Sequence, residues 1–246
     1  MTDDYKFPLA LPSAEKHHMT LDRDGPLFIL RLHYKDNRFT TEFCQAILTA
    51  LQIVENIFLD ATPVDMALVT IGEGKIYSNG LDLSQVLGYP PFMDVYLQML
   101  KRLLTFCIPT VAALNGHAFA GGCLLAMVHD YRVMRSDRGF ICMNEVDLPA
   151  SLPPGMCAVI REKLTPTTFR NMVLQGHRFS SQEALDQNIV DIICPEKEVF
   201  SKAKELALKW APKAQSGLVY KQLKDEMYSN VVKGLSVPYH RLAPKM

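Results

Sequence analysis

The sequence has no excess of charge of either sign. Its 246 residues contain 26 lysines and arginines against 26 aspartates and glutamates. A nucleic-acid-binding protein needs a basic surface or a run of basic residues, and no such run is present. No apolar run is long enough to cross a membrane either. We therefore expect neither a nucleic-acid partner nor a membrane span.

Closely spaced cysteines are also absent. The six cysteines lie far apart and form no C-x-x-C motif, which is the spacing that metal sites and redox-active dithiols commonly use. Several of them lie within apolar runs, as buried reduced cysteines do. We expect reduced core thiols of an intracellular protein, and no metal site.

What the sequence does contain is an alternation of strand-like and helix-like segments, which predicts an α/β fold. Residues 1–16 are expected to be an unstructured lead, and residues 19–32 are typical of two short strands. Helical spacing of apolar residues begins after Thr41, which is predicted to cap that helix. We divide the chain into a core over residues 1–196 and a C-terminal helical region over residues 197–246.

The most informative stretch spans residues 108–127. Residues 110–114 form a short apolar run, which predicts a buried strand, and Asn115-Gly116 ends it with a turn. Gly121-Gly122 then opens a segment with the composition of a buried helix. A glycine pair there leaves N–H groups free beside the positive end of the helix dipole, which suits an anion or an oxyanion. A glycine pair can also serve tight helix packing alone.

A second turn that contains glycine, Asn79-Gly80-Leu81-Asp82, follows another strand-like segment. If the two strands are neighbours, two backbone N–H groups can converge on one oxygen atom. Downstream, Glu145 is a carboxylate among apolar residues. An oxyanion pocket and such a carboxylate together favour proton abstraction next to a carbonyl group.

These segments resemble the enoyl-CoA hydratase/isomerase (crotonase) superfamily, and within it most of all the Δ3,Δ2-enoyl-CoA isomerases. The resemblance covers about residues 20–230. It is carried by residues 75–83, 108–127, 129–132, 144–145 and 175–191. It implies a spiral of ββα turns, an acyl-CoA thioester ligand, and a C-terminal helical region used in trimer contacts. A homotrimer or a dimer of trimers is the expected assembly.

Carried over to this chain, the resemblance places the two oxyanion donors at the backbone N–H groups of Leu81 and Gly121. The hydratases have one carboxylate three residues after the second oxyanion glycine, where this chain has Leu124. Their second carboxylate matches Glu145.

The same resemblance indicates the segment that binds acyl-CoA. Asn79 matches a residue whose backbone carbonyl meets the adenine, and Lys75 a position that can reach a CoA phosphate. Ser78 and Gly80 belong to the same substrate-binding segment. No nucleophile elbow surrounds Ser78, so its hydroxyl is not expected to attack the substrate. Acyl-CoA is then the substrate, and we expect no cofactor.

The loss of one carboxylate favours an isomerase over a hydratase. Adding water to a double bond needs water that is held and activated, which Leu124 cannot do; its apolar side chain should instead dry the site. A double-bond shift from C3 to C2 needs one base, and we predict that this base is Glu145. Four apolar neighbours are expected to raise the pKa of its carboxyl group: Leu124, Met143, Val146 and Leu148.

Two other functions stay open. A thioesterase or another reaction of the superfamily would also use a stabilised enolate. A non-catalytic acyl-CoA-binding subunit is the third alternative, because Pro149-Ala150-Ser151 stands where the isomerases tend to have Gly-Leu-Pro. Asp147 is a weaker rival to Glu145 as the base.

Three other polar residues are interpreted as structural. Asp82 suits a turn or a cap, and His117 lacks a nucleophile to activate. His129 is expected at a helix end, where a positive charge is favoured. The final residues, Pro244-Lys245-Met246, loosely resemble a peroxisomal targeting tripeptide. We therefore expect a peroxisomal location, with the cytoplasm as the alternative.

Overall fold

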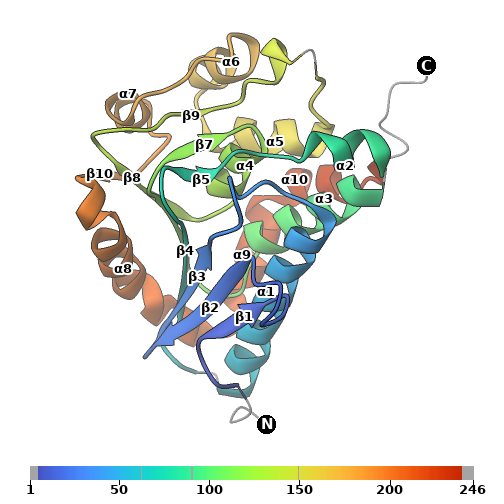
Figure 1. Ribbon diagram of the computed structural model, residues 1–246. Helices are drawn as coiled ribbons and strands as arrows, with labels where there is room; N and C mark the ends of the chain where they lie inside the picture. Colours follow the sequence, from blue (N-terminus) through green and yellow to red (C-terminus); the bar gives the residue numbers. More distant parts are fainter. Residues whose placement is uncertain (1–4, 62, 90, 149, 240–246) are drawn as a thin grey trace.

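The computed structural model describes residues 5–61, 63–89, 91–148 and 150–239. One sheet has the strand order β1-β2-β3-β4-β6-β8-β10, and a smaller sheet has the order β5-β7-β9 (Figure 1). The strands are β1 (Leu9–Leu11), β2 (Met19–Asp24), β3 (Leu27–Leu32), β4 (Ala67–Gly72), β5 (Ile76–Ser78), β6 (Thr110–Leu114), β7 (His117–Phe119), β8 (Tyr131–Arg135), β9 (Ile141–Cys142) and β10 (Ile192–Cys194). The α-helices are α1 (Thr41–Ala61), α2 (Leu83–Gly88), α3 (Pro91–Leu104), α4 (Gly121–Met127), α5 (Pro154–Lys163), α6 (Pro166–Leu174), α7 (Ser181–Asp186), α8 (Val199–Trp210), α9 (Val219–Met227) and α10 (Ser229–Leu235). Short 3₁₀ helices are η1 (Glu145–Asp147), η2 (Glu196–Glu198) and η3 (Ala211–Ser216).

The middle of the chain repeats one pattern. A strand of the large sheet is followed by a strand of the small sheet and then by helix: β4, β5, then α2 and α3; β6, β7, then α4; β8, β9, then η1 and α5. The strands of successive repeats pair in parallel in both sheets. This is a spiral of ββα turns, which confirms the predicted α/β class.

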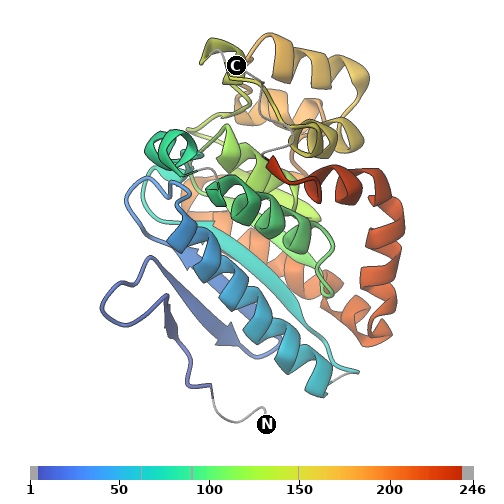
Figure 2. The ribbon, with the colours of Figure 1, turned by 90° about the vertical axis from the view of Figure 1, so that its right-hand side faces the viewer.

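The middle of the large sheet, formed by β3, β4 and β6, is buried on both faces. Alternate residues of a strand point to opposite faces, and in β3 Phe28 and Leu30 join the core under α1, α3 and α4, whereas Leu27 and Ile29 join the core under α8. Figures 1 and 2 show α8 on one side of the sheet and α1 and α3 on the other. Burying one such side chain contributes about 1.5–3 kcal/mol to folding.

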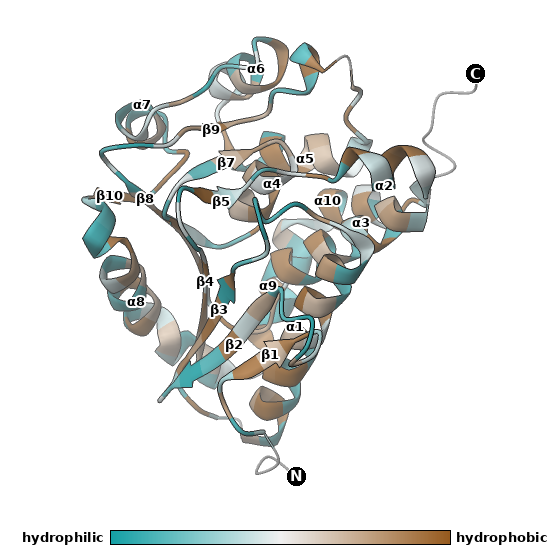
Figure 3. Cartoon of the chain, viewed as in Figure 1, coloured by the Kyte–Doolittle hydropathy of each residue, from teal (hydrophilic) through white to brown (hydrophobic). Residues whose placement is uncertain are grey.

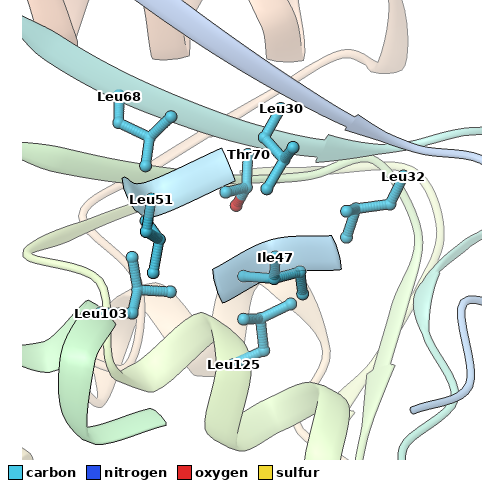
Figure 4. A pocket seen from close by; sticks show the side chains of 8 residues that line it. All are labelled: Leu30, Leu32, Ile47, Leu51, Leu68, Thr70, Leu103 and Leu125. Carbon is cyan, nitrogen blue, oxygen red and sulfur yellow. The ribbon is translucent and has the colours of Figure 1, made fainter. Parts of the chain in front are cut away.

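The core between the sheet and α1 is closed. Side chains from β3, β4, α1, α3 and α4 meet there (Figure 4), and the space between them leaves no room for a water molecule. This core therefore holds no ligand site.

Helix α1 is the one helix of the described ranges that is long and apolar enough to cross a membrane. More than half of its most apolar window is buried inside the protein, where it packs against the sheet and α3. Figure 3 colours both α1 and β4 largely brown, that is hydrophobic, and both contribute side chains to this core.

Two expectations about the N-terminal part were wrong. The lead is not without structure, because β1 pairs antiparallel with β2; a strand of three residues depends on that pairing and has little pattern of its own. The cap of α1 is Thr40, not Thr41: the Thr40 hydroxyl oxygen accepts a hydrogen bond from the Phe43 N–H at 3.2 Å.

Candidate active site

Two glycine-containing turns lie side by side at one end of the small sheet. β5 and β7 pair in parallel, with Ser78 opposite Ala118, so the turns that follow them lie at the same edge. A β-carbon on Gly80 would lie 3.1 Å from the Gly121 nitrogen, and one on Gly121 would lie 3.0 Å from Leu81 Cδ2. The structure thus brings Leu81 and Gly121, the two expected oxyanion donors, next to each other.

The N–H of Leu81 has a defined direction. Leu81 forms a parallel bridge with Phe39, in which the Phe39 N–H donates to the Gly80 carbonyl at 2.8 Å and the Asp82 N–H donates to the Phe39 carbonyl at 2.9 Å. In a parallel bridge, one residue makes both of its hydrogen bonds to the two neighbours of the residue opposite. The N–H and C=O groups of that opposite residue then point away from the bridge. The Leu81 N–H therefore points away from Phe39, available for a ligand atom.

The N–H of Gly121 belongs to the first residue of α4, so it has no acceptor within that helix. The preceding residue, Ala120, has φ 50° and ψ −117°, a conformation that costs a non-glycine residue about 1–3 kcal/mol. Two hydrogen bonds hold it there: its N–H donates to the Cys142 carbonyl at 2.9 Å, and its carbonyl accepts from the Leu124 N–H at 3.1 Å. The surroundings thus aim the peptide that carries the Gly121 N–H.

The two glycines of the pair have different tasks. A β-carbon on Gly122 would lie 2.2 Å from the Ser78 carbonyl oxygen, so Gly122 lets α4 pack tightly against β5. Gly121 faces Leu81 and the hydroxyl of Tyr96 instead. Both interpretations of the glycine pair therefore apply, each to one residue.

Glu145 is a half-buried residue at the start of η1, and its carboxyl group is largely shielded from solvent. Its Oε2 atom is inaccessible to solvent and has no hydrogen-bond partner in the described part of the chain. This burial raises the pKa of Glu145 to about 7. Burial also raises the pKa of the Tyr96 hydroxyl and of the Cys123 thiol, and the charge of Glu145 adds to both shifts. Glu145 thus carries a carboxyl group whose pKa suits a general base at neutral pH.

The expected apolar surroundings of Glu145 were only half right. Val146 and Leu148 are each 49% exposed, because the tight turn of η1, with about three residues per turn, directs them outward. Leu124 and Met143 are fully buried.

Asp147 and Asp82, the two other acidic residues considered in the sequence, have different surroundings from Glu145. Asp147 is exposed and lies against Gly176, where a β-carbon would come within 3.1 Å of its Oδ2. Asp82 caps α2: its Oδ1 accepts from the N–H groups of Ser84 at 2.9 Å and Gln85 at 3.3 Å. Hydrogen bonds from Ser84, first its hydroxyl group, lower the pKa of Asp82. The structural interpretation of Asp82 is confirmed.

Ser78 and Gly80 shape the loop between the two donors. The Ser78 hydroxyl is fully buried and donates to the Asn37 carbonyl at 2.7 Å, and its oxygen accepts from the Gly80 N–H at 3.3 Å. The hydroxyl is thus turned into the protein, and it does not face a ligand.

Lys75 and Asn79 lie on the outer side of the same loop. Lys75 is exposed, and the Asn79 side chain donates to Asp36 Oδ2 at 3.4 Å. Arg38 Nη1 donates to the Asn79 carbonyl at 3.5 Å, the carbonyl expected to meet the adenine. Sequence reasoning missed Arg38, although it adds a cation where CoA phosphates are expected.

His117 and His129, the two histidines interpreted as structural, both have hydrogen-bond partners within the protein. His117 Nδ1 accepts from the Phe140 N–H at 3.3 Å. His129 donates from Nδ1 to the Leu125 carbonyl at 2.7 Å and accepts at Nε2 from the Thr70 hydroxyl at 2.9 Å. Burial lowers the pKa of His129 to about 3, so His129 is neutral. The expectation that its positive charge suits the helix dipole was wrong.

No group of three histidine, cysteine, aspartate or glutamate side chains in the described ranges is placed to hold a metal ion. The arrangement that the structure does offer has two adjacent backbone N–H donors and one desolvated carboxyl group. Such a site can polarise a carbonyl group and move a proton beside it.

Comparison with known proteins confirms the family that the sequence resembles. Residues 30–237 match the family model described as enoyl-CoA hydratase/isomerase, so the chain belongs to that family. Enoyl-CoA delta isomerase 2, peroxisomal, of Arabidopsis thaliana is 34% identical over 85% of this chain and 91% of its own length. Enoyl-CoA delta isomerase 3 of the same plant is 31% identical over 91% of this chain and 98% of its own length.

Solved structures share the fold. The human mitochondrial delta3-delta2-enoyl-CoA isomerase matches with a TM-score of 0.74 and 22% identity, covering 92% of this chain and 98% of that chain. An enoyl-CoA hydratase from Mycobacterium marinum matches with a TM-score of 0.79 and 24% identity, covering 92% of this chain and 100% of that chain. At this level of identity the likeness concerns the fold, and it agrees with the spiral described above.

Proposed function

We propose that this protein is a Δ3,Δ2-enoyl-CoA isomerase, which converts a 3-enoyl-CoA thioester to the 2-trans-enoyl-CoA in fatty-acid β-oxidation. The observation that carries the proposal is the single desolvated carboxyl group of Glu145 at a site with two backbone donors. The names of the plant relatives, delta isomerases at 34% and 31% identity, support the same activity.

The proposed reaction moves one proton and one double bond. The Glu145 carboxylate removes a proton from C2, which is acidic because it is next to the thioester and to the double bond. The electron pair passes into a dienolate, whose oxygen accepts hydrogen bonds from the N–H groups of Leu81 and Gly121. Each donor contributes about 3–4 kcal/mol to lowering the barrier. Glu145 then returns the proton at C4, and the double bond lies between C2 and C3.

The reaction consumes no water, oxidant or cofactor. The acyl-CoA is the substrate, and every proton that leaves it returns to it. Leu124, fully buried one turn after Gly121, supplies no group that could hold a water molecule. A hydratase needs that water, and this difference favours the isomerase.

Replacement of Glu145 by glutamine tests the proposal. With a 3-enoyl-CoA substrate and detection of the conjugated product, Glu145→Gln should lose at least about two orders of magnitude in kcat. Asp147→Asn is the matched control, because Asp147 is a carboxylate of the same 3₁₀ helix that is exposed; it should keep its activity. Full activity of Glu145→Gln would contradict the proposal.

Two further measurements separate the alternatives. A thioesterase would release free thiol from a saturated acyl-CoA. A non-catalytic subunit would bind CoA esters without turnover in the wild-type protein. Of the segment that motivated this last alternative, Pro149 lies outside the described residues, and the Ala150 N–H donates to the Glu145 carbonyl at 3.0 Å.

We also propose a homotrimer or a dimer of trimers. Helix α9 supports it, because Val219, Leu223 and Met227 form an apolar stripe with one residue per helical turn, and all three are at least half exposed. Light scattering after size-exclusion chromatography measures the assembly. Leu223→Glu should reduce its mass, and an unchanged mass would exclude this stripe from the interface.

For the location, we propose the peroxisome, with the cytoplasm as the alternative. Two of the Arabidopsis relatives are named peroxisomal, at 34% and 30% identity, whereas a rat relative at 27% identity is named mitochondrial. The tripeptide Pro244-Lys245-Met246 lies outside the described residues. A fluorescent fusion at the N-terminus, with and without this tripeptide, should show punctate and diffuse fluorescence respectively.

A further inference from the structure

Tyr96 joins two parts of the site. Its side chain comes from α3 and is fully buried, and its hydroxyl donates to the Gly121 carbonyl at 2.9 Å. A β-carbon on Gly121 would lie 2.9 Å from the same hydroxyl oxygen, so the tyrosine is in direct contact with this glycine. The charge of Glu145 also acts on the Tyr96 hydroxyl. The hydroxyl is therefore close to the first residue of α4 and within electrostatic reach of the proposed base.

The aromatic ring of Tyr96 is itself held in place. It packs against Phe39 with ring centroids 5.1 Å apart, and against Phe92 at 6.3 Å. Phe39 is the residue whose backbone bridges to Leu81. One aromatic cluster thus contacts the backbone segments that carry both oxyanion donors.

The peptide unit that carries the Gly121 N–H has a hydrogen-bonded peptide unit on each side. On one side, the Ala120 N–H donates to the Cys142 carbonyl; on the other, the Gly121 carbonyl accepts from Tyr96. Because peptide units are planar, fixing these two neighbours limits the rotation of the unit that carries the Gly121 N–H. Donors stabilise an oxyanion strongly only when they are aimed before the reaction starts.

A packing role would not need the hydroxyl. Phenylalanine fills nearly the same space, and a buried phenol has to find a hydrogen-bond partner that phenylalanine does not need. The hydrogen-bond partner of the Tyr96 hydroxyl is the carbonyl group of Gly121, the residue whose N–H is the second oxyanion donor.

We propose that Tyr96 is a positioning residue of the oxyanion hole, whose hydroxyl holds the Gly121 carbonyl and so directs the Gly121 N–H. The proposal rests on the proposed function for the substrate. The positioning itself applies to any reaction that places a negatively charged oxygen on Leu81 and Gly121.

The test compares Tyr96→Phe with Tyr77→Phe. Tyr77 is also fully buried, and its hydroxyl shares a hydrogen bond of 2.8 Å with the Thr70 hydroxyl in the core. Each variant loses one buried hydroxyl and keeps its ring, so both should unfold at similar temperatures. Two properties are then measured: kcat and KM with a 3-enoyl-CoA, and the near-ultraviolet absorbance of the enolate that a bound 3-ketoacyl-CoA forms.

For Tyr96→Phe we expect kcat to fall by roughly tenfold to a hundredfold, with little change in KM, because a misdirected donor affects the transition state more than binding. The enolate absorbance should fall in parallel, and Tyr77→Phe should keep both properties. Equal effects in the two variants, an unchanged Tyr96→Phe, or a Tyr96→Phe that does not fold would each overturn the proposal.

The enolate readout also separates this proposal from the proposed function. If the wild-type protein forms the enolate but does not turn over 3-enoyl-CoA, the isomerase is contradicted, and loss of the enolate in Tyr96→Phe would still support the positioning. If the wild type isomerises the substrate and Tyr96→Phe does so equally well, only the positioning is contradicted.

Discussion

The ammonium group of Lys224 lies 2.7 Å from Asp130 Oδ2 in the interior of the protein. Asp130 directly follows His129 in the turn between α4 and β8, and Lys224 belongs to α9. Asp130 Oδ2 also accepts from the Thr110 N–H at 2.9 Å, and Lys224 also donates to the Phe106 carbonyl at 3.1 Å. This buried pair attaches the C-terminal helices to the spiral, next to the C-terminal end of α4.

Removing one partner of this pair should be costly. Lys224→Ala leaves the Asp130 carboxylate buried without its cation, and we expect the free energy of unfolding to fall by about 3–5 kcal/mol. Lys221→Ala is the matched control, since Lys221 pairs with Asp225 four residues along the same helix at the partly exposed surface and should cost only about 0–1 kcal/mol. Chemical denaturation measures both, and equal losses would mean that the buried pair contributes no more than a surface pair.

The activity should depend on the ionisation of Glu145. Burial raises the pKa of its carboxyl group to about 7, and a base must be deprotonated to accept a proton. We expect kcat/KM for 3-enoyl-CoA to fall as the pH drops below about 7, and to level off above it. A profile that stays flat down to pH about 5 would assign the base to a group with an ordinary carboxyl pKa.

The stability should depend on pH in the opposite sense. The folded protein binds the Glu145 proton more tightly than the unfolded chain does, because the folded pKa of about 7 lies above the ordinary value of 4.5. This contribution is present at low pH and is lost as the pH rises through about 7, by at most about 3 kcal/mol. Thermal unfolding of wild type and Glu145→Gln between pH 4 and 8 should show this loss in the wild type alone. Parallel curves would contradict it.

Gly122 should tolerate no side chain. A β-carbon there would lie 2.2 Å from the Ser78 carbonyl oxygen, so Gly122→Ala has to push α4 away from β5. We expect a large loss of stability or of activity. Gly88→Ala serves as the control, because a β-carbon at Gly88 would meet no atom within 4 Å. Thermal unfolding and the isomerase assay compare them, and a Gly122→Ala variant equal to Gly88→Ala would show that this helix can shift freely.

Arg38 and Lys75 should recognise the nucleotide end of CoA. Either alanine variant should raise KM for an acyl-CoA by about threefold to tenfold, the scale of one partly exposed charged hydrogen bond. KM for the corresponding pantetheine thioester, which lacks the nucleotide phosphates, should not change. Lys202→Ala on α8, beyond the other face of the sheet, is the control. Equal changes with both substrates would exclude a phosphate contact.

Local patterns were enough to predict much of the fold. Residues 19–32 form the strands β2 and β3, the apolar run at residues 110–114 is β6, and the glycine pair opens α4. Each of these depends on residues close together in the chain, for which propensity and spacing are informative. β1 could not be found in this way, because its stability comes from pairing with β2.

The candidate site, too, could be predicted from the sequence only in part. The sequence by itself determined which groups are available: two glycine-containing turns after strand-like segments, one carboxylate at Glu145, and a leucine, Leu124, in place of the other carboxylate of the hydratases. Only the tertiary structure decided the surroundings of these groups. It turned Val146 and Leu148 outward, left Glu145 Oε2 buried without a partner, and brought Tyr96 from a separate helix onto Gly121. The reason is physical: desolvation and hydrogen bonding depend on atoms that are far apart in the chain and meet only when it folds.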